Sequence, residues 1–181
     1  MEKTHFESVS VFDLDGTLYY KNSHLEILHC YFRTKIFESF PMKVLGKLWL
    51  SGYMRILDFA YRKIPLAYRN KFLLDFRPEI LSILNSRRTV SKVLILSNGP
   101  KEIINNAAKS LNVVGLQAPI GRKLDVLNNY CSYTHLFACT DNPTDMDILK
   151  AAEKRVVLIS PKTKRKFSDI QKEAGTKVIE V

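Results

Sequence analysis

The stretch that decides the fold is Ser8–Thr17, which reads SVSVFDLDGT. Its first five residues are typical of a buried β-strand. The strand is followed by Asp13 and Asp15, and Gly16 suits the turn that comes next. In an open α/β sheet, ligands bind beyond the carboxyl ends of the strands, so this stretch predicts a polar site. An Asp-rich turn without chemistry is the alternative interpretation.

Further apolar runs of strand length recur toward the C-terminus and alternate with segments of helical length and composition. Strands followed by helices predict a parallel sheet with helices on both faces, the Rossmann-like α/β class. The expected strands, besides Ser8–Asp13, are Val93–Ser97, Val113–Gln117, Thr134–Thr140, Arg155–Ser160 and Lys177–Val181, and the expected helices are Pro100–Leu111, Arg122–Tyr130, Pro143–Lys154 and Lys162–Ala174.

The segment between the first two strands has a different character. Apolar residues recur there at helical spacing, first near Leu25–Ile36 and again over Met42–Ile64, and Pro65 precedes a short helical stretch, Leu66–Phe76. We therefore predict a core domain formed by residues 1–19 and 90–181, with an all-helical insertion over residues 20–89.

Composition excludes several classes of protein. With 46% hydrophobic and 25% charged residues in 181, the chain is too apolar to be disordered. No uncharged stretch reaches the ~18 residues of a membrane span, and MEKTHFESVS lacks the apolar segment of a signal peptide. Three widely spaced cysteines favour reduced thiols, so we expect a cytoplasmic protein.

Charge is distributed unevenly along the chain. The net charge is +10, and residues 21–90 hold 13 of the 28 Lys and Arg residues but only 5 of the 18 Asp and Glu residues. A basic lobe favours an anionic partner: a phosphorylated substrate, an acidic membrane surface or nucleic acid. No nucleic-acid-reading motif is present, so we expect no nucleic acid.

Two other expected strand ends carry polar side chains. Ser97-Asn98-Gly99-Pro100 leads into a helix, where a hydroxyl and free N–H groups suit an anion, although an ordinary capped turn has the same composition. Asp141 and Asp145 follow a later strand and offer the hard oxygen ligands that Mg²⁺ prefers. Asp147 fits a helix start and nothing more.

Taken in order, these positions resemble the motifs of the haloacid dehalogenase (HAD) superfamily of Mg²⁺-dependent phosphohydrolases. The first motif matches Asp13–Thr17, within the longer stretch FDLDGTL, and Ser97 in LILSNG matches the second. Lys123, ahead of a helix, matches the third motif, and Asp141 with Asp145 matches the acidic fourth. The chain is most similar to the phosphoserine-phosphatase-like branch, including prenyltransferase-associated phosphatase domains, and residues 20–89 lie where that branch has its helical C1 cap.

The resemblance implies a Mg²⁺-dependent hydrolase of phosphate monoesters. Asp13 would be the nucleophile that forms an aspartyl-phosphate, and Asp15 the general acid and base. It further implies that Thr17, Ser97, Asn98 and Lys123 bind phosphate, that Asp13, Asp15 and Asp141 hold Mg²⁺, and that Asp145 orients Lys123 or the metal's water. The stretch LYYKNSHLE has no counterpart of the substrate-binding acid of true phosphoserine phosphatases.

The sequence is compatible with more than one kind of binding partner. We expect a small-molecule or lipid phosphate as the substrate, and the basic stretch over residues 42–64 is a candidate for peripheral contact with an anionic membrane. A solvated helix whose apolar face packs on its neighbours is the simpler explanation of that stretch. The alternative function is a catalytically idle HAD fold that binds a phospho-ligand, a membrane or a protein.

Overall fold

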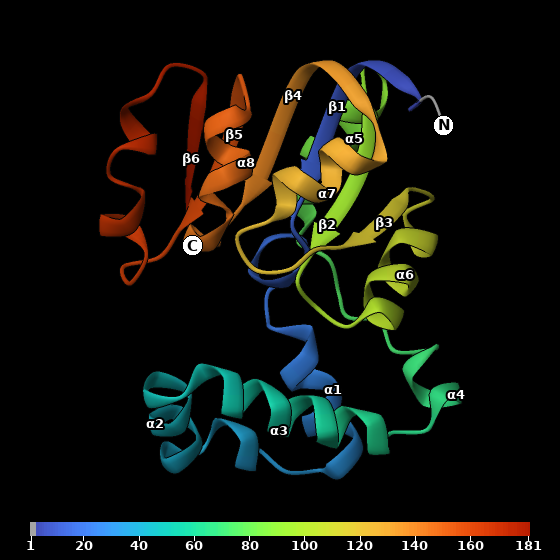
Figure 1. Cartoon of the computed structure of the whole chain (residues 1–181), viewed down its shortest axis with the longest axis vertical. Coiled ribbons are helices and arrows are strands. Elements are labelled where there is room, and N and C mark those ends of the chain that lie inside the picture. The colour runs from blue at the N-terminus through green and yellow to red at the C-terminus, as the bar shows by residue number, and fades with distance from the viewer. Residues whose placement is uncertain (1–2) are drawn as a thin grey trace.

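The computed structural model describes residues 3–181. Met1 and Glu2, which belong to the predicted range 1–19, lie outside the described residues. The centre of the molecule is a six-stranded sheet in the order β3-β2-β1-β4-β5-β6, and every neighbouring pair is parallel (Figure 1). The predicted parallel sheet is therefore confirmed. The strands are β1 His5–Phe12, β2 Lys92–Ser97, β3 Val114–Gln117, β4 Ser132–Thr140, β5 Lys154–Ile159 and β6 Thr176–Glu180.

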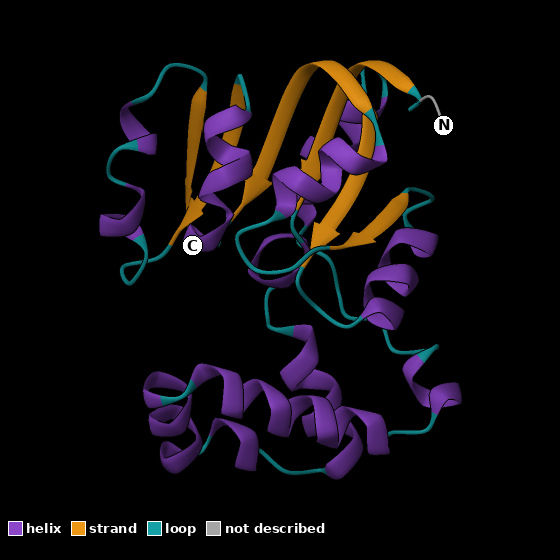
Figure 2. Cartoon of the chain, in the orientation of Figure 1, coloured by secondary structure: helices purple, strands orange, loops and turns teal. Residues whose placement is uncertain are grey.

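Helices cover both faces of this sheet (Figure 2). Successive residues of a strand point to opposite faces, so Phe12 packs in one apolar cluster and Val11 in the other. The Phe12 cluster includes helices α5 (Pro78–Arg88) and α6 (Lys101–Ser110), and the Val11 cluster includes α7 (Lys123–Tyr130) and α8 (Met146–Ala151). Burial on both faces explains why the strands are almost continuously apolar.

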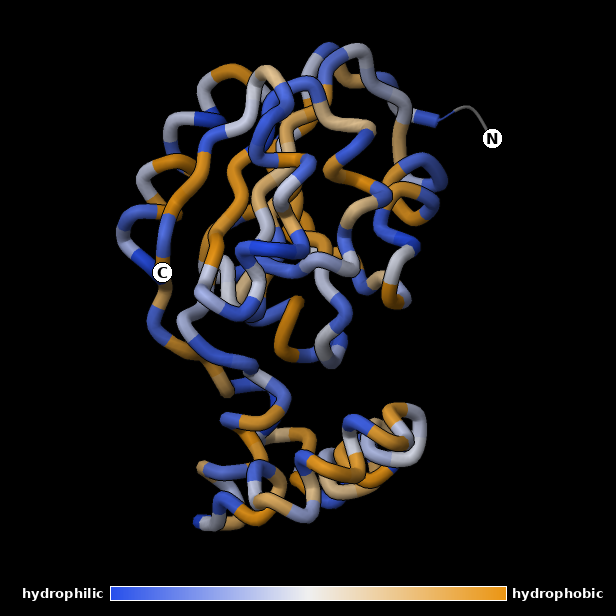
Figure 3. The backbone as a smooth tube through the Cα atoms, turned by 90° about the vertical axis from the view of Figure 1, so that its left-hand side faces the viewer, coloured by the Kyte–Doolittle hydropathy of each residue, from blue (hydrophilic) through white to orange (hydrophobic). Residues whose placement is uncertain are grey.

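The helical insertion lies below the carboxyl ends of the strands and apart from the sheet (Figures 1 and 3). The chain leaves the sheet domain at Tyr19 and returns at Phe76, where the two residues form an antiparallel bridge and their rings stack with centroids 5.0 Å apart. The two connections to the insertion thus run side by side. Its helices are α1 Ser23–Phe32, α2 Phe40–Leu48, α3 Leu50–Lys63 and α4 Leu66–Arg69.

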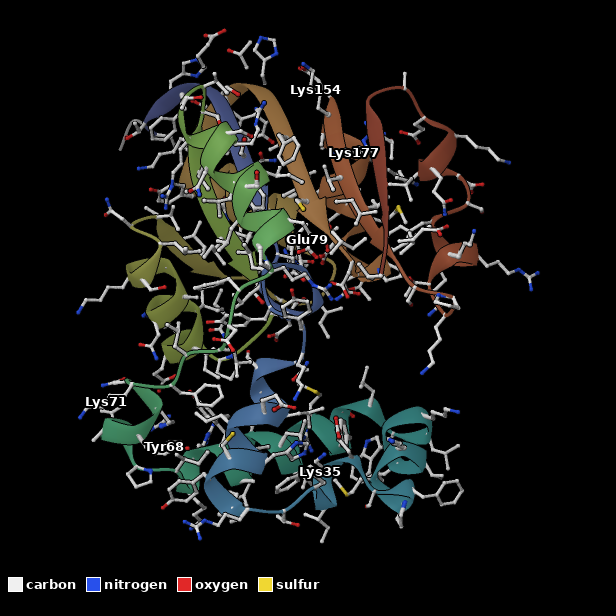
Figure 4. The ribbon with its side chains drawn as sticks, turned by 180° about the vertical axis from the view of Figure 1, so that it is seen from behind. Lys35, Tyr68, Lys71, Glu79, Lys154 and Lys177 are labelled. Carbon is white, nitrogen blue, oxygen red and sulfur yellow. The ribbon has the colours of Figure 1, made fainter. Side chains whose placement is uncertain are left out.

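The boundary predicted after residue 89 differs from this arrangement. Helix α5 buries Ile80 and Leu84 in the cluster beneath the sheet, and Arg87 donates a hydrogen bond from Nε to Ser10 Oγ on β1 (2.9 Å). From behind, the ribbon around Glu79 lies against the sheet, whereas Lys35 and Tyr68 belong to the insertion (Figure 4). We therefore place α5 with the sheet domain and the insertion between Tyr19 and Phe76.

Two predicted helices take another form. Over Met42–Ile64 the helix breaks at Trp49, whose ring lies so close to Gly52 that a Cβ there would be 2.3 Å from it, and α2 and α3 form a hairpin. Lys162–Ala174 forms only two 3₁₀ turns, Lys164–Phe167 and Ile170–Lys172. Phe167 and Ile170 are both buried at a spacing of three, which suits 3₁₀ geometry. The helix predicted there is wrong.

Within residues 3–181, no helix combines the length and the apolar character that a bilayer crossing needs.

Candidate active site

The first aspartate stands at the end of β1, where the predicted polar site lies. Asp13 is 4% exposed, and its backbone N–H donates to the carbonyl of Cys139 on β4 (2.9 Å). The chain then makes a tight turn over Leu14–Leu18, in which Gly16 adopts a φ of +75°. This turn brings Asp15 to the wall of the same cavity as Asp13.

The turn requires glycine for a second reason. A Cβ on Gly16 would lie 2.1 Å from Oδ2 of Asp141, so only glycine allows this aspartate to approach. Asp141 is fixed by Thr17, whose hydroxyl donates to Oδ1 (3.0 Å) and accepts from the Asp141 N–H (2.9 Å). Thr17 is fully buried and its hydroxyl is engaged with Asp141, which gives it a positioning contact, while its predicted contact with phosphate stays a prediction.

Lys123 is the first residue of α7 and is 1% exposed. Its ammonium lies 2.6 Å from Oδ1 of Asp13 and 2.6 Å from Oδ2 of Asp145. A buried ammonium is stable only with such partners, so this pairing fixes the lysine at the carboxyl edge of the sheet. The predicted lysine therefore lies at the site, beside the proposed nucleophile.

Asp145 is completely buried and also accepts a hydrogen bond from the Thr140 hydroxyl (2.6 Å). Of the two roles that the sequence left open for Asp145, the contacts favour the orientation of Lys123. Asp147 has a partner that the sequence did not reveal, because its Oδ2 accepts from the backbone N–H of Leu124 (2.9 Å). It therefore caps the start of α7 directly after Lys123.

The loop after β2 forms another wall. Ser97 is 1% exposed and accepts a weak hydrogen bond from the Gly99 N–H (3.3 Å). The amide nitrogen of Asn98 donates to the carbonyl of Ala118 (2.7 Å), and Gln117 donates to the carbonyl of Gly99 (2.9 Å). The Asn98 side chain thus anchors the loop to the end of β3, and its predicted contact with phosphate stays a prediction.

A cavity of about 460 Å³, which we call the catalytic cavity, lies at the carboxyl edge of the sheet. Asp13, Asp15, Ser97 and Asp141 line it from the sheet domain, and residues of the insertion line it from the other side. The first helix of the insertion also touches the machinery directly, because the Ser23 N–H donates to Oδ1 of Asp15 (2.8 Å). The insertion therefore both covers the cavity and orients Asp15.

Burial dominates the electrostatics of the site. It raises the pKa of Asp13 to about 6 even though Lys123 opposes the shift, and the nearby Asp141 raises it further. Burial likewise raises the pKa of Asp141 and of Asp145 to about 6 each, and it raises the pKa of Asp15. Burial alone would lower the pKa of Lys123, but Asp13 and Asp145 together raise it.

The donor set fits a small hard cation. The carboxyl groups of Asp13, Asp15, Asp141 and Asp145 lie around the buried ammonium of Lys123. Their excess of negative charge is what a divalent cation would offset. Within residues 3–181 no group of three or more His, Cys, Asp or Glu side chains is arranged to hold a metal ion. A Mg²⁺ ion here would use the carboxylates of Asp13 and Asp141 and complete its shell with backbone, water and substrate oxygens, as this ion commonly does.

Sequence reasoning missed several residues of the site. His24 and Met54 of the insertion line the catalytic cavity, and His24 is 5% exposed with no hydrogen-bond partner for Nε2 among the described residues. The Ser23 N–H and the Asp147 cap were also missed. Only Asp147 carried a signal, because it belongs to the acidic run after Thr140; the others come from a helical segment whose packing no local pattern reveals.

No protein-family model and no curated protein matches this sequence. Solved structures do match. A protein of unknown function from Bordetella pertussis Tohama I has a TM-score of 0.70 at 12% identity, covering 96% of this chain and 98% of that one. A HAD-family hydrolase from Salmonella enterica serovar Typhi has a TM-score of 0.60 at 12% identity, and the match covers 88% of this chain and 65% of that one.

A phosphoserine phosphatase determined as an analogue of its phospho-aspartyl intermediate also matches. Its TM-score is 0.60 at 16% identity, with 92% of this chain and 91% of that chain covered. At such identities the likeness concerns the fold, and it extends over nearly the whole chain. This protein therefore has the fold of the HAD-family hydrolases, in the form seen in phosphoserine phosphatases.

Proposed function

We propose that this protein hydrolyses phosphate monoesters through an aspartyl-phosphate formed on Asp13. The observation that carries the proposal is the 2.6 Å contact between Lys123 and Asp13, which lines the same cavity as Asp15. This contact joins a candidate nucleophile to a cation that can neutralise the charge of a phosphate. The fold of phosphoserine phosphatases supports the proposal.

The first half-reaction uses both aspartates of the turn. A carboxylate oxygen of Asp13 attacks phosphorus, and the bond from phosphorus to the alcohol oxygen breaks. Asp15 gives its proton to the departing alkoxide, and its raised pKa keeps that proton available nearer neutral pH. The products of this step are the free alcohol and a phosphorylated Asp13.

The second half-reaction returns the enzyme to its starting state. The Asp15 carboxylate takes a proton from a water molecule, which attacks phosphorus and breaks the bond to Asp13. Inorganic phosphate leaves, Asp13 is again a carboxylate, and Asp15 is again protonated. The hydrogen bond from the Ser23 N–H keeps Asp15 in place through both steps.

Charge on the phosphoryl group is neutralised by the walls of the site. The Lys123 ammonium has three N–H donors, and Asp13 with Asp145 takes two of them, which leaves the third for a phosphoryl oxygen. The Ser97 hydroxyl and the N–H groups of its loop supply neutral donors. Mg²⁺ held by Asp13 and Asp141 would reduce the repulsion between the carboxylate and the phosphate dianion.

The substrate is a small-molecule phosphate, and the proposed location is the cytoplasm. The basic insertion favours an anionic substrate whatever its leaving group. Contact of this insertion with membranes stays a prediction, tested separately below.

The test is a phosphatase assay of the whole chain with p-nitrophenyl phosphate, in Mg²⁺ and after treatment with EDTA. We expect release of phosphate only with Mg²⁺, and none from Asp13→Asn, because an amide cannot form the acyl-phosphate. Lys150→Gln, an exposed change on α8, is the control for handling and stability. Turnover by Asp13→Asn at the wild-type rate would show that Asp13 is not the nucleophile, and no turnover of any phosphate ester would support the idle fold.

A further inference from the structure

A second cavity lies on the helical insertion, between α2 and α3. It has a volume of about 550 Å³, and its walls are mostly apolar: Phe40, Val44, Leu50 and Tyr53 contribute to them. Lys43, Lys47 and Lys162 also line it. We call this cavity the apolar groove. Lys162 belongs to the loop after β5, so the sheet domain contributes to one wall of the groove.

The groove adjoins the catalytic cavity on both of its sides. On the insertion, Tyr53 lines the groove and its neighbour Met54 lines the catalytic cavity. On the sheet domain, Lys162 lines the groove and its neighbour Thr163 lines the catalytic cavity. Two pairs of adjacent residues, one on the insertion and one on the sheet domain, thus bring the groove close to the catalytic cavity.

Local contacts maintain the shape of the groove. The Tyr53 hydroxyl donates to the carbonyl of Phe37 (3.2 Å), which fixes the ring against the hairpin. The ring packs on α2 at Gly46, where a Cβ would make an ordinary van der Waals contact with it at 3.5 Å. The insertion mixes hydrophobic and hydrophilic residues along its helices (Figure 3).

The apolar side chains of the groove are exposed to a degree that packing within the chain does not explain. Phe40 is 80% exposed and Leu50 is 54% exposed. Apolar surface that gathers in one concave place is typical of a binding site. An occupant that fits these walls would therefore supply hydrocarbon.

The three lysines of the groove indicate that its occupant also carries a negative charge. Their ammonium groups favour an anion at the entrance, and their aliphatic stems can lie along a hydrocarbon chain. A phosphate joined to an apolar tail satisfies both demands, whereas a short polar alcohol leaves the apolar walls in water.

We propose that the apolar groove binds the hydrocarbon tail of the substrate, so that the preferred substrates are phosphate monoesters of long-chain apolar alcohols. This inference rests on the proposed phosphatase function. It predicts that kcat/KM rises with the length of the alkyl chain, while the chemistry at Asp13 and Asp15 stays the same.

The experiment compares butyl, hexyl, octyl and decyl phosphate, each below its micelle-forming concentration, with the full chain in Mg²⁺. Complete burial of one methylene is worth about fourfold in affinity, and a groove open on one side should give about twofold. From butyl to decyl phosphate, which adds six methylenes, we therefore expect kcat/KM to rise by roughly 60-fold.

Three variants test whether the groove causes the dependence of kcat/KM on chain length. Val44→Asp and Leu50→Asp place a charge in the groove at positions exposed enough to tolerate it, and we expect each to lower kcat/KM for decyl phosphate about tenfold or more. Their activity on butyl phosphate should stay within about twofold of wild type, since that chain is too short to fill the groove. Phe59→Asp, on the opposite side of α3 and 65% exposed, is the matched control and should behave as wild type on both substrates.

The tail proposal and the phosphatase proposal fail in different ways. If wild type hydrolyses p-nitrophenyl phosphate but shows no dependence on chain length, the groove does not bind the tail and the phosphatase function stands. If no ester is hydrolysed, the phosphatase proposal fails, and calorimetry of decyl against butyl phosphate with wild type and Leu50→Asp still decides the groove. Equal affinity for the two phosphates in wild type would overturn the tail proposal; tighter binding of decyl phosphate that Leu50→Asp abolishes would support it.

Discussion

Lys123 and Asp13 are 110 residues apart in the chain, yet the ammonium nitrogen of one lies 2.6 Å from a carboxylate oxygen of the other, and both are buried. Asp145 holds the same ammonium at the same distance. Three elements, β1, α7 and the segment after β4, must be placed correctly for this contact to form. The Lys123–Asp13 ion pair at the edge of the sheet therefore forms only when the sheet domain is correctly folded.

Replacing Lys123 with methionine should destabilise the protein and abolish catalysis. Methionine fills a similar volume but leaves Asp13 and Asp145 buried without their cation, and breaking such a pair costs about 3–5 kcal/mol. Thermal unfolding should therefore begin roughly 10 °C lower. The added change Asp145→Asn should recover part of the lost stability without restoring activity. A single Lys123→Met variant with wild-type stability would mean that the buried pair is not formed in solution.

The loss of activity in Asp15→Asn should depend on the leaving group of the ester. A general acid matters most when the departing alkoxide is a strong base. We expect the variant to lose at least about 100-fold in kcat on alkyl phosphates and clearly less on p-nitrophenyl phosphate, whose phenolate leaves without help. Steady-state kinetics on the two substrate types measures the difference. Equal losses on both would assign Asp15 a structural role.

Asp141 and Asp147 lie six residues apart and should respond differently to alanine. Asp141→Ala removes one of the two carboxylates proposed for Mg²⁺, so the Mg²⁺ concentration for half-maximal activity should rise at least about tenfold. Asp147→Ala removes the acceptor for the Leu124 N–H and should cost about 1 kcal/mol of stability, as caps commonly do, with kcat changed by less than about threefold. A similar rise in the Mg²⁺ requirement of both variants would refute this division of roles.

The stability of the metal-free protein should fall as the pH rises through about 6. Asp13, Asp141 and Asp145 have pKa values near 6 in the folded chain, above the 3.8 of an unfolded aspartate, so the folded state holds more protons between these values. Their contribution to stability is therefore complete below about pH 4 and is lost as the pH passes 6. Melting curves in EDTA should show a smaller loss between pH 5 and 7 for Asp141→Asn than for wild type. Added Mg²⁺ should raise the melting temperature more at pH 7.5 than at pH 5, and the opposite order would contradict the metal site.

The outer face of α3 is the surface through which the predicted membrane contact would be made. Ile56 and Phe59 are exposed there, with Trp49 lying over Gly52 on the same face and Arg55, Arg62 and Lys63 close by. If this face meets membranes, the protein should sediment with anionic liposomes at low salt and dissociate above about 0.3 M salt. Phe59→Asp should weaken sedimentation, whereas Leu50→Asp, in the groove, should change it less. No sedimentation of wild type at low salt would leave this face as solvated surface.

Sequence alone determined the class of fold and the order of its elements. All six strands were predicted with ends within three residues of the observed ones, because strands buried on both faces are apolar throughout and each ends at polar or turn residues. The positions of Asp13, Asp15, Ser97 and Asp141 followed from the same logic, since the carboxyl ends of parallel strands meet at one edge. These features are local in the chain, and a local pattern can reveal them.

The tertiary structure decided how those positions are used. Lys123 is one lysine of many in the sequence, and only the packing of α7 brings its ammonium to Asp13. The sequence places Thr17 beside the two aspartates, and only the folded structure shows that its hydroxyl is bonded to Asp141. Helix α5 belongs to the sheet rather than the insertion because Leu84 is buried beneath the strands, which helical periodicity cannot distinguish from burial within the insertion. Contacts between segments far apart in the chain depend on how whole elements pack, and for that reason only the folded structure shows them.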